Sequence, residues 1–126
     1  MIQPGEIRKI LTPFYDSATH QKSVKSRPAL VIARADFADT VVLPISSVSR
    51  RENLHPVYDI EIDPSVYPKL NLRKVSYVRT HKQTVIHSAE ISDVISSIKD
   101  EYPELYLDIL QKREMFSQDV TNQALR

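Results

Sequence analysis

The sequence predicts an α+β protein that is mainly β, with a strand-rich body followed by a helical tail. Short apolar runs rich in β-branched residues recur from residue 6 to residue 86, each bounded by turn-forming residues. After Ser88 the apolar spacing changes to that of a helix, and Pro103 stands where a second helix would begin. We therefore expect a single domain over residues 1–126, with a barrel at about 4–87 and a helical tail at about 88–118.

Six strands are expected in the body, spaced as closely as in a barrel or sandwich. The run from Ala29 to Ala33 and the run from Val41 to Leu43 are continuously apolar, which favours strands that are buried on both faces. Prolines lie at or near the ends of the runs, where a missing N–H does least harm. The expected strands are Glu6–Leu11, Pro28–Ala33, Thr40–Ile45, Val57–Ile62, Lys74–Arg79 and Thr84–Ile86.

Two helices are expected after the body. The first is indicated by apolar residues at i, i+3, i+4 and i+7, with Ser88 as its N-cap. These residues are Ile91, Val94, Ile95 and Ile98. The second helix begins at Pro103, which suits a first helical position because it has no N–H to leave unpaired. Residues 119–126 have no strong pattern and are expected to fray.

The amino-acid composition excludes several classes of function. The chain has one glycine, Gly5, whereas a P-loop needs two at fixed spacing and a dinucleotide-binding fingerprint needs three. It has no cysteine, which excludes disulfides, thiolate zinc sites and cysteine nucleophiles. No apolar run is long enough for a signal peptide or a membrane span. We expect a soluble cytoplasmic protein with no membrane partner.

Charge is unevenly distributed along the chain. The formal net charge is +1, but residues 1–88 carry 13 basic and 8 acidic side chains, whereas residues 89–126 carry 4 basic and 8 acidic ones. All four histidines also lie in the basic part. This asymmetry favours an anionic partner such as nucleic acid, although the two segments could instead neutralise each other across an internal contact.

The residues available for chemistry favour a reaction on RNA. No histidines or carboxylates have the spacing of a zinc or magnesium site, so neither a metal nor another cofactor is expected. Arg, Lys, His and hydroxyl side chains suit cleavage of RNA, because the substrate's own 2′-OH is the nucleophile. Such groups gather in the expected basic loop Ser17–Arg27 and in Pro44–Ser47, where a buried strand ends in two hydroxyls. Both could also be solvated polar loops.

Four segments in order resemble the MazF/PemK family of type II toxins. They are Pro4-Gly5-Glu6-Ile7, then Lys25-Ser26-Arg27-Pro28-Ala29-Leu30-Val31-Ile32, then Val41-Val42-Leu43-Pro44-Ile45-Ser46-Ser47, and then Val78-Arg79-Thr80. The resemblance covers about residues 4–110. It implies an SH3-like barrel with C-terminal helices, a homodimer, and a metal-independent endoribonuclease that cuts single-stranded RNA within short sequences. It also implies a cognate antitoxin protein whose disordered tail lies across the RNA groove.

The resemblance assigns three candidate catalytic residues. Arg27 matches the family arginine that precedes the proline of the second strand and is expected to stabilise the charge of the scissile phosphate. Ser46 matches a hydroxyl position and would hydrogen-bond the phosphate or position the nucleophile. His20 lies one residue further from the arginine than the loop histidine of the PemK branch and is the candidate acid or base.

Further residues are expected to contact RNA. Lys74 and Ser76 stand where the PemK branch has an arginine and an aspartate, and Tyr77 stands where many members have glutamine. Arg79 matches the arginine of the family's Arg-Thr pair, which leaves a structural and a phosphate-directed role open. The complete RNA-binding set is Lys22, Lys25, Ser47, Lys74, Ser76, Tyr77 and Arg79, with Phe14 and Tyr15 as further candidates to stack on a base.

Two alternatives remain open at the level of sequence. The missing aspartate and the altered loop before Arg27 fit a catalytically weakened relative that binds RNA or a protein without cutting. The third hypothesis is a gyrase-targeting toxin, because the CcdB family is thought to share this barrel.

Overall fold

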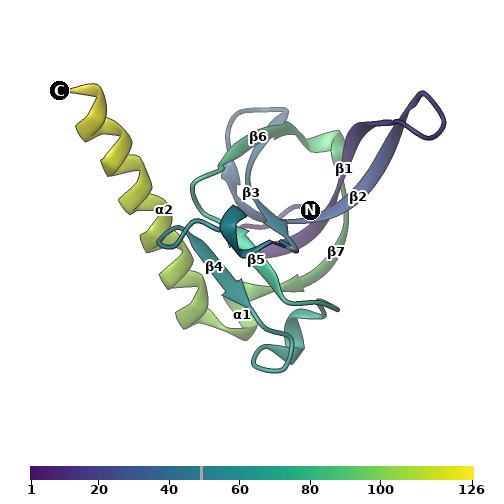
Figure 1. The fold of residues 1–126 in the computed structure, drawn as a ribbon. Helices are drawn as coiled ribbons and strands as arrows, with labels where there is room; N and C mark the ends of the chain where they lie inside the picture. The colour runs from purple at the N-terminus through teal and green to yellow at the C-terminus, as the bar shows by residue number, and fades with distance from the viewer. Residues whose placement is uncertain (49) are drawn as a thin grey trace.

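In the computed structural model, seven antiparallel strands form one sheet that curls into a half-barrel, and a long C-terminal helix packs against it (Figure 1). The structure describes residues 1–48 and 50–126, with the side chains of residues 12–15 left out of the description. The elements are β1 (Glu6–Asp16), β2 (Gln21–Arg34), β3 (Asp39–Ser46), η1 (Arg51–Asn53), β4 (Asp59–Ile62), η2 (Pro68–Leu70), β5 (Ser76–Arg79), β6 (Thr84–His87), η3 (Ser88–Glu90), β7 (Ile91–Ser97), α1 (Ile98–Glu101) and α2 (Pro103–Ala124). The mainly β fold with a C-terminal helix is confirmed.

Strand β3 pairs with β2 along one edge and, along the other edge, first with β6 and then with β5. The strand order is β4-β5-β3-β2-β1-β7, with β6 also paired to β3. The register of β3 with β2 runs as far as Ala29 opposite Pro44. On the opposite edge, residues Asp39 to Val42 of β3 pair with β6, and Ile45 and Ser46 pair with Val78 and Tyr77 of β5. Because Pro44 has no N–H for the ladder, it suits the end of the pairing with β2.

Both faces of β2 and β3 are buried, as their continuous apolar runs predict. Leu30, Leu43 and Ile45 face the main core, which lies between the sheet, α1 and α2. Val31 and Val42 face the opposite side, in a second apolar cluster with Ala29 and the partly buried Ile10 and Ile86. The alternation that separates these two sets is the period-2 alternation of a strand.

The helix predicted over residues 91–98 is wrong, because this segment forms β7. Its β-branched residues favour a strand, and the free edge of β1 supplies the partner. The register of β1 with β7 shifts on both sides of Arg8, as at β-bulges. The apolar residues of β7 do not share one face, because Ile91 packs against the second cluster, Ile95 packs against the main core and Val94 is 51% exposed. Their helix-like spacing therefore does not mark one buried stripe. The N-cap role predicted for Ser88 is wrong for the same reason, since Ser88 begins η3.

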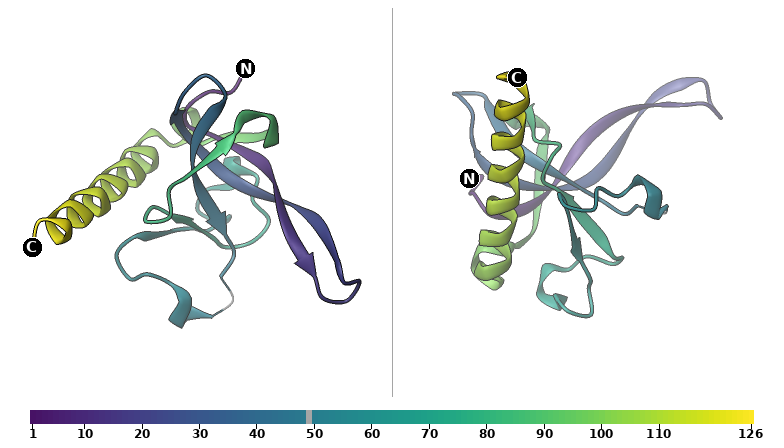
Figure 2. Two further views of the ribbon diagram at one scale, coloured as in Figure 1. Left: turned by 90° about the horizontal axis from the view of Figure 1, so that it is seen from above. Right: turned by 60° about the vertical axis from the view of Figure 1, so that its left-hand side comes forward.

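The basic loop predicted over residues 17–27 is mostly strand. Only residues 17–20 form a turn, and β2 begins at Gln21. Residues 11–26 form a two-stranded ribbon, here called the arm, in which Leu11 is opposite Ser26 and Asp16 is opposite Gln21. Figures 1 and 2 show the arm projecting from the body on the side opposite to α2.

The second predicted helix begins at Pro103 as expected, but it does not fray after residue 118. Helix α2 continues to Ala124. Side-chain contacts between residues four positions apart support its last turns, including Gln118 Nε2 to Asn122 Oδ1 at 3.2 Å and Gln123 Nε2 to Asp119 Oδ2 at 3.1 Å.

Gly5 is required where it stands, and its replacement by alanine should destabilise the fold. Its φ of +91° is in the region that favours glycine, and an added Cβ would collide with Cβ of Lys99. Gly5 cannot move away easily, because its N–H donates to the Val31 carbonyl and its carbonyl accepts from the Ile98 N–H. We expect Gly5→Ala to lower the free energy of unfolding by more than about 1 kcal/mol in a urea titration. Equal stability of the variant and the natural protein would contradict this account.

Candidate functional site

A groove opens where β2 and β3 part. The two strands are paired as far as Ala29 and Pro44, so Arg27 and Ser46 lie just beyond the last pair. The groove has a volume of about 630 Å³. Residues from β2, from the end of β3 and from the segment before β5 line it. They are Lys25, Ser26, Arg27, Pro28, Ile45, Ser46, Ser47, Leu72, Arg73, Lys74 and Ser76.

The groove is strongly positive. Four of its lining side chains are cations, namely Lys25, Arg27, Arg73 and Lys74, and all four are exposed to solvent. None of the described residues that line it is acidic. Serine hydroxyls stand among the cations. A surface with this charge and these donors is suited to binding phosphate groups.

A second, mainly apolar pocket adjoins the groove. It has a volume of about 290 Å³ and shares Arg27, Pro28, Ile45 and Ser46 with the groove. Its other lining residues are Ile10, Val42, Pro44, Thr84 and Ile86. Arg27 and Ser46 therefore lie at the junction between a positive surface and an apolar hollow, where an anionic group and an apolar or planar group could be held side by side.

The structure brings six of the predicted site residues together in the groove: Arg27, Ser46, Lys25, Ser47, Lys74 and Ser76. Ser76 is only 7% exposed, and its hydroxyl donates to the Lys74 carbonyl at 3.0 Å, so it supports the groove wall. Sequence reasoning missed Arg73. The feature of the sequence that could have indicated Arg73 is its position beside Lys74, because the two are adjacent cations just before a strand.

The other predicted residues lie elsewhere. His20 is in the turn at the tip of the arm, and Lys22 is also on the arm. The Tyr77 hydroxyl donates to Glu61 Oε1 at 3.4 Å, and burial, with the Glu61 charge adding to it, raises the pKa of Tyr77. The side chains of Phe14 and Tyr15 are outside the described part of the chain.

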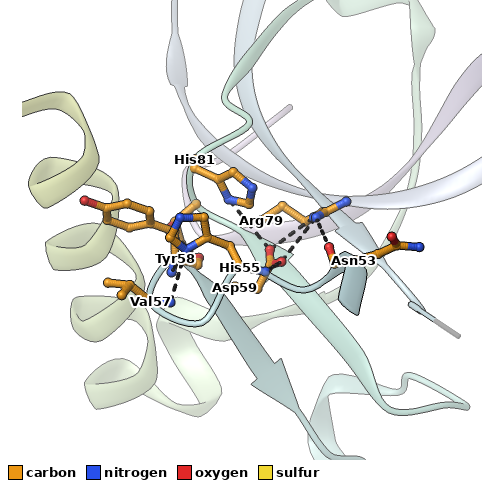
Figure 3. A network of polar contacts seen from close by, with 8 residues as sticks. Asn53, His55, Val57, Tyr58, Asp59, Arg79 and His81 are labelled. Carbon is orange, nitrogen blue, oxygen red and sulfur yellow. Dashed lines mark hydrogen bonds and ion pairs between the residues drawn. The ribbon is translucent and has the colours of Figure 1, made fainter. Parts of the chain in front are cut away.

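Arg79 is held in a separate polar cluster (Figure 3). Its Nε donates to Oδ1 of Asp59 at 3.1 Å, its Nη2 to Oδ2 of Asp59 at 3.2 Å and to the Asn53 carbonyl at 3.0 Å. The Asp59 carboxylate is only 1% exposed and also accepts from the His55 N–H at 2.8 Å. Arg79 therefore ties β4, β5 and the segment around η1 together and is not among the residues that line the groove.

His81 is packed against this cluster and against α2. Its ring lies 5.1 Å from the ring of His55 and 6.1 Å from the ring of Phe116. Its buried Nδ1 is 3.7 Å from Oδ1 of Asp59, too far for a hydrogen bond, and has no hydrogen-bond partner among the described residues. Burial lowers the pKa of His81 below its usual 6.5, and the charge of Asp59 only partly opposes this.

The lowered pKa of His81 predicts a loss of stability in acid. The unfolded chain takes up a proton at this histidine near pH 6.5, whereas the folded protein takes it up only at lower pH. Stability that is present above pH 6.5 is therefore lost as the pH falls through that value. We expect His81→Phe to lose less free energy of unfolding than the natural protein between pH 7.5 and pH 5.5, as measured by urea titration. Equal losses in the two proteins would contradict the assignment.

The described residues contain neither a metal-binding cluster nor a membrane-spanning helix. No group of three or more His, Asp or Glu side chains in residues 1–48 and 50–126 is placed to hold a metal ion. In the same part of the chain, no helix combines the length and the apolarity needed to cross a bilayer.

Comparison with known proteins identifies the family. Residues 3–112 match the family of PemK-like, MazF-like toxins of type II toxin–antitoxin systems. The chain therefore belongs to this family, whose toxins are endoribonucleases. No curated protein matches its sequence.

Two solved structures share the fold. One is an endoribonuclease in complex with its cognate antitoxin from a mycobacterial species, with 14% sequence identity and a TM-score of 0.64 over 94% of this chain and 96% of that chain. The other is the Mycobacterium tuberculosis toxin MazF-mt6, with 18% identity and a TM-score of 0.55 over 86% of this chain and 96% of that chain. Because the sequence identities are only 14% and 18%, the similarity to these two structures shows a shared fold and nothing more.

Proposed function

We propose that this toxin is a sequence-specific endoribonuclease that cleaves single-stranded RNA bound in the groove between β2 and β3. The observation that carries the proposal is the groove itself, which is lined by four cations, Arg27 among them, and by several serine hydroxyls, Ser46 among them, with no acidic residue in the described lining. RNA supplies both the phosphate charges that such a surface attracts and the 2′-OH that serves as nucleophile. The proposal places the protein in the cytoplasm, where messenger RNA is found.

The proposed reaction uses the substrate's own hydroxyl. A base takes the proton of the 2′-OH, the 2′ oxygen bonds to phosphorus, and the bond from phosphorus to the 5′ oxygen breaks as that oxygen gains a proton. Negative charge develops on the phosphate oxygens during this step. The guanidinium of Arg27 stabilises that charge by binding two oxygens at once, and the Ser46 hydroxyl positions the phosphate. Because the nucleophile is not a water, no metal is needed to activate one.

The direct test is incubation of the purified protein with a long single-stranded RNA in the presence of EDTA. We expect discrete fragments that end in a 2′,3′-cyclic phosphate on one side and a 5′-OH on the other. The absence of fragments, or equal cleavage by Arg27→Ala, would overturn the proposal.

A second candidate function is RNA binding without cleavage. It is favoured by one observation: no histidine or carboxylate is among the described residues that line the groove of a single copy. Tight binding of RNA without any cleavage would favour this second function over the first.

The proposal includes protein partners. The toxin acts as a homodimer and is neutralised by a cognate antitoxin that covers the positive groove. The similar mycobacterial endoribonuclease in complex with its antitoxin supports this partner, and an acidic antitoxin segment would complement the charge of the groove.

RNA affinity should depend on salt in proportion to the phosphates that the groove neutralises. Four cations predict a plot of log affinity against log salt with a slope of roughly −3, since each phosphate on a single strand contributes about −0.7. Arg73→Ala should reduce the magnitude of this slope by about 0.7. Lys112→Ala, on α2, is the matched control and should leave the slope unchanged. Fluorescence titrations of a labelled oligonucleotide measure both, and an unchanged slope for Arg73→Ala would remove this residue from the interface.

A further inference from the structure

A row of three polar side chains runs from the groove across the outer face of the sheet. Ser46, which lines the groove, is paired with Tyr77 of β5, and Tyr77 is paired with Glu61 of β4. Directly opposite residues of antiparallel strands project from the same face. The residues that alternate with this row, such as Val78 and Ile62, are buried in the main core, so the row faces outward. Because neighbouring strands lie about 4.8 Å apart, Glu61 is about 10 Å from Ser46.

The next row on the same face is not accessible to a ligand. It consists of Arg79 and Asp59, which are also directly opposite one another (Figure 3). The Asp59 carboxylate is only 1% exposed, and both of its oxygens accept hydrogen bonds from Arg79. Glu61, by contrast, is exposed. The pair of Tyr77 and Glu61 is therefore the accessible part of this face beside the groove.

The carboxylate of Glu61 is oriented but has spare capacity for hydrogen bonds. Its Oε1 accepts from the Tyr77 hydroxyl at 3.4 Å, and the described residues give it no other hydrogen bond. An ionised carboxylate accepts at about four lone-pair sites, so most of these sites remain for the donors of a ligand. Burial and the Glu61 charge raise the pKa of Tyr77, whereas the charge of Arg51 in η1 acts in the opposite direction, so a cation also lies near this pair.

We propose that Tyr77 and Glu61 form a base-recognition site that selects guanine beside the scissile phosphate. The inference rests on the proposed function and adds to it a residue that determines specificity, Glu61. With the phosphate at Arg27 and Ser46, the attached base lies over the neighbouring strand, on the half-buried ring of Tyr77. Stacking on an aromatic ring accepts every base, so the choice among bases depends on Glu61.

Guanine is the base whose donors fit a carboxylate. Bases of single-stranded RNA are read on their base-pairing edges. The edge of guanine presents two adjacent donors, N1–H and N2–H, which reach both oxygens of one carboxylate together. Adenine and cytosine each present one amino donor beside an acceptor nitrogen, and uracil presents one N–H between two carbonyl oxygens. Those acceptors would face the oxygens of Glu61, which have no proton to donate.

Sequencing of the cleaved ends tests the choice of base. The natural protein is incubated with single-stranded RNA of random sequence, and the nucleotides on both sides of each cut are read. We expect guanine at one position beside the cut. Glu61→Gln replaces one acceptor oxygen with an amide donor at almost unchanged size. It should lower the preference for guanine at that position by about 5- to 150-fold, the range for the loss of a bidentate contact to a base.

A glutamate elsewhere on the surface provides the matched control. Glu90 is exposed at the end of η3, just before β7, and β7 lies at the opposite edge of the sheet from β4. Glu90→Gln makes the same chemical change away from the site and should keep the natural preference for guanine. Urea titrations of both variants check that each is folded.

The stacking ring is tested separately, by binding. Tyr77→Leu keeps an apolar side chain but removes the ring, and should weaken the binding of single-stranded oligonucleotides by about 5- to 150-fold whichever base is present. A 2′-deoxy nucleotide at the scissile position prevents cleavage during the titration, because the nucleophile is then absent. Equal affinity of Tyr77→Leu and the natural protein would remove the ring from the site.

The remaining outcomes separate this inference from the proposed function. A natural cleavage pattern without guanine beside the cut, or a guanine preference that Glu61→Gln retains or that Glu90→Gln also loses, would overturn the role of Glu61. Failure of the natural protein to cleave any RNA would instead overturn the proposed function. Binding titrations with oligonucleotides that differ only in that one base would still measure the choice of guanine in that case.

Discussion

Arg27→Ala is expected to lower the rate of RNA cleavage by about a hundred- to a thousand-fold, which is the cost of removing one donor that stabilises transition-state charge. The side chain is exposed at the edge of the groove and next to the end of the β2–β3 ladder, so its loss should leave the fold intact. Rates on a single-stranded oligonucleotide under saturating conditions measure the effect. Circular dichroism and urea titration should show no change in folding.

Two further variants separate the role of Arg27 from general charge. Arg34→Ala removes an exposed arginine from the other end of β2, away from the groove, and should retain natural activity. Arg27→Lys keeps the positive charge but cannot bind two phosphate oxygens in the planar geometry of a guanidinium, so an intermediate rate is expected. Natural rates in Arg27→Ala, or an equal loss in Arg34→Ala, would contradict the assignment.

The strands could be predicted from sequence wherever their pairing is regular. The apolar runs around Leu30 and Leu43 identify β2 and β3, because both faces of these strands are buried and the pattern has no competing interpretation. The strand β7 could not be predicted in this way. Ile91, Val94 and Ile95 have the spacing of a helix although they lie in different surroundings, in the second cluster, at the surface and in the main core respectively. The edge of β1 that makes this segment a strand is far away in sequence.

The arm was missed for a different reason. Residues 21–27 are polar except for Val24 and lack the alternating apolar face by which a half-buried strand is recognised in sequence. A ribbon that projects from the body does not need that face. The sequence therefore indicates an exposed basic segment but not its extended shape, and the extended shape is what separates His20 from Arg27.

The candidate site was predictable in part. Arg27 and Ser46 were identified because each lies in a segment that resembles the toxin family, and the groove contains both. Arg73 belongs to the groove through the approach of the segment before β5, a contact between residues distant in sequence. The partnership of Arg79 with Asp59 joins residues twenty positions apart on neighbouring strands, so no local pattern could reveal that this arginine holds a carboxylate.

The contact between Arg79 and Asp59 predicts the second large effect, on stability. In Arg79→Met the carboxylate of Asp59, which is 1% exposed, would lose its cation and two hydrogen bonds while remaining buried. Removing one partner of a buried pair leaves an uncompensated charge, and we expect a loss of about 3 kcal/mol in the free energy of unfolding. The Asn53 carbonyl would also lose a donor, which releases the segment around η1. Urea titrations at pH 7.5 measure the loss.

A double-mutant cycle isolates the pair from the general cost of the substitutions. Asp59→Asn removes the carboxylate charge, so in its presence Arg79→Met should cost less than it does in the natural protein, by about 1 kcal/mol or more. Arg79→Lys should fall between the natural protein and Arg79→Met, because an ammonium keeps the charge but cannot span both carboxylate oxygens and the Asn53 carbonyl. A loss below about 1 kcal/mol in Arg79→Met, the value typical of an exposed ion pair, would show that this contact does not hold the strands together. In that case Arg79 would be available for the phosphate-directed role that its sequence position also allows.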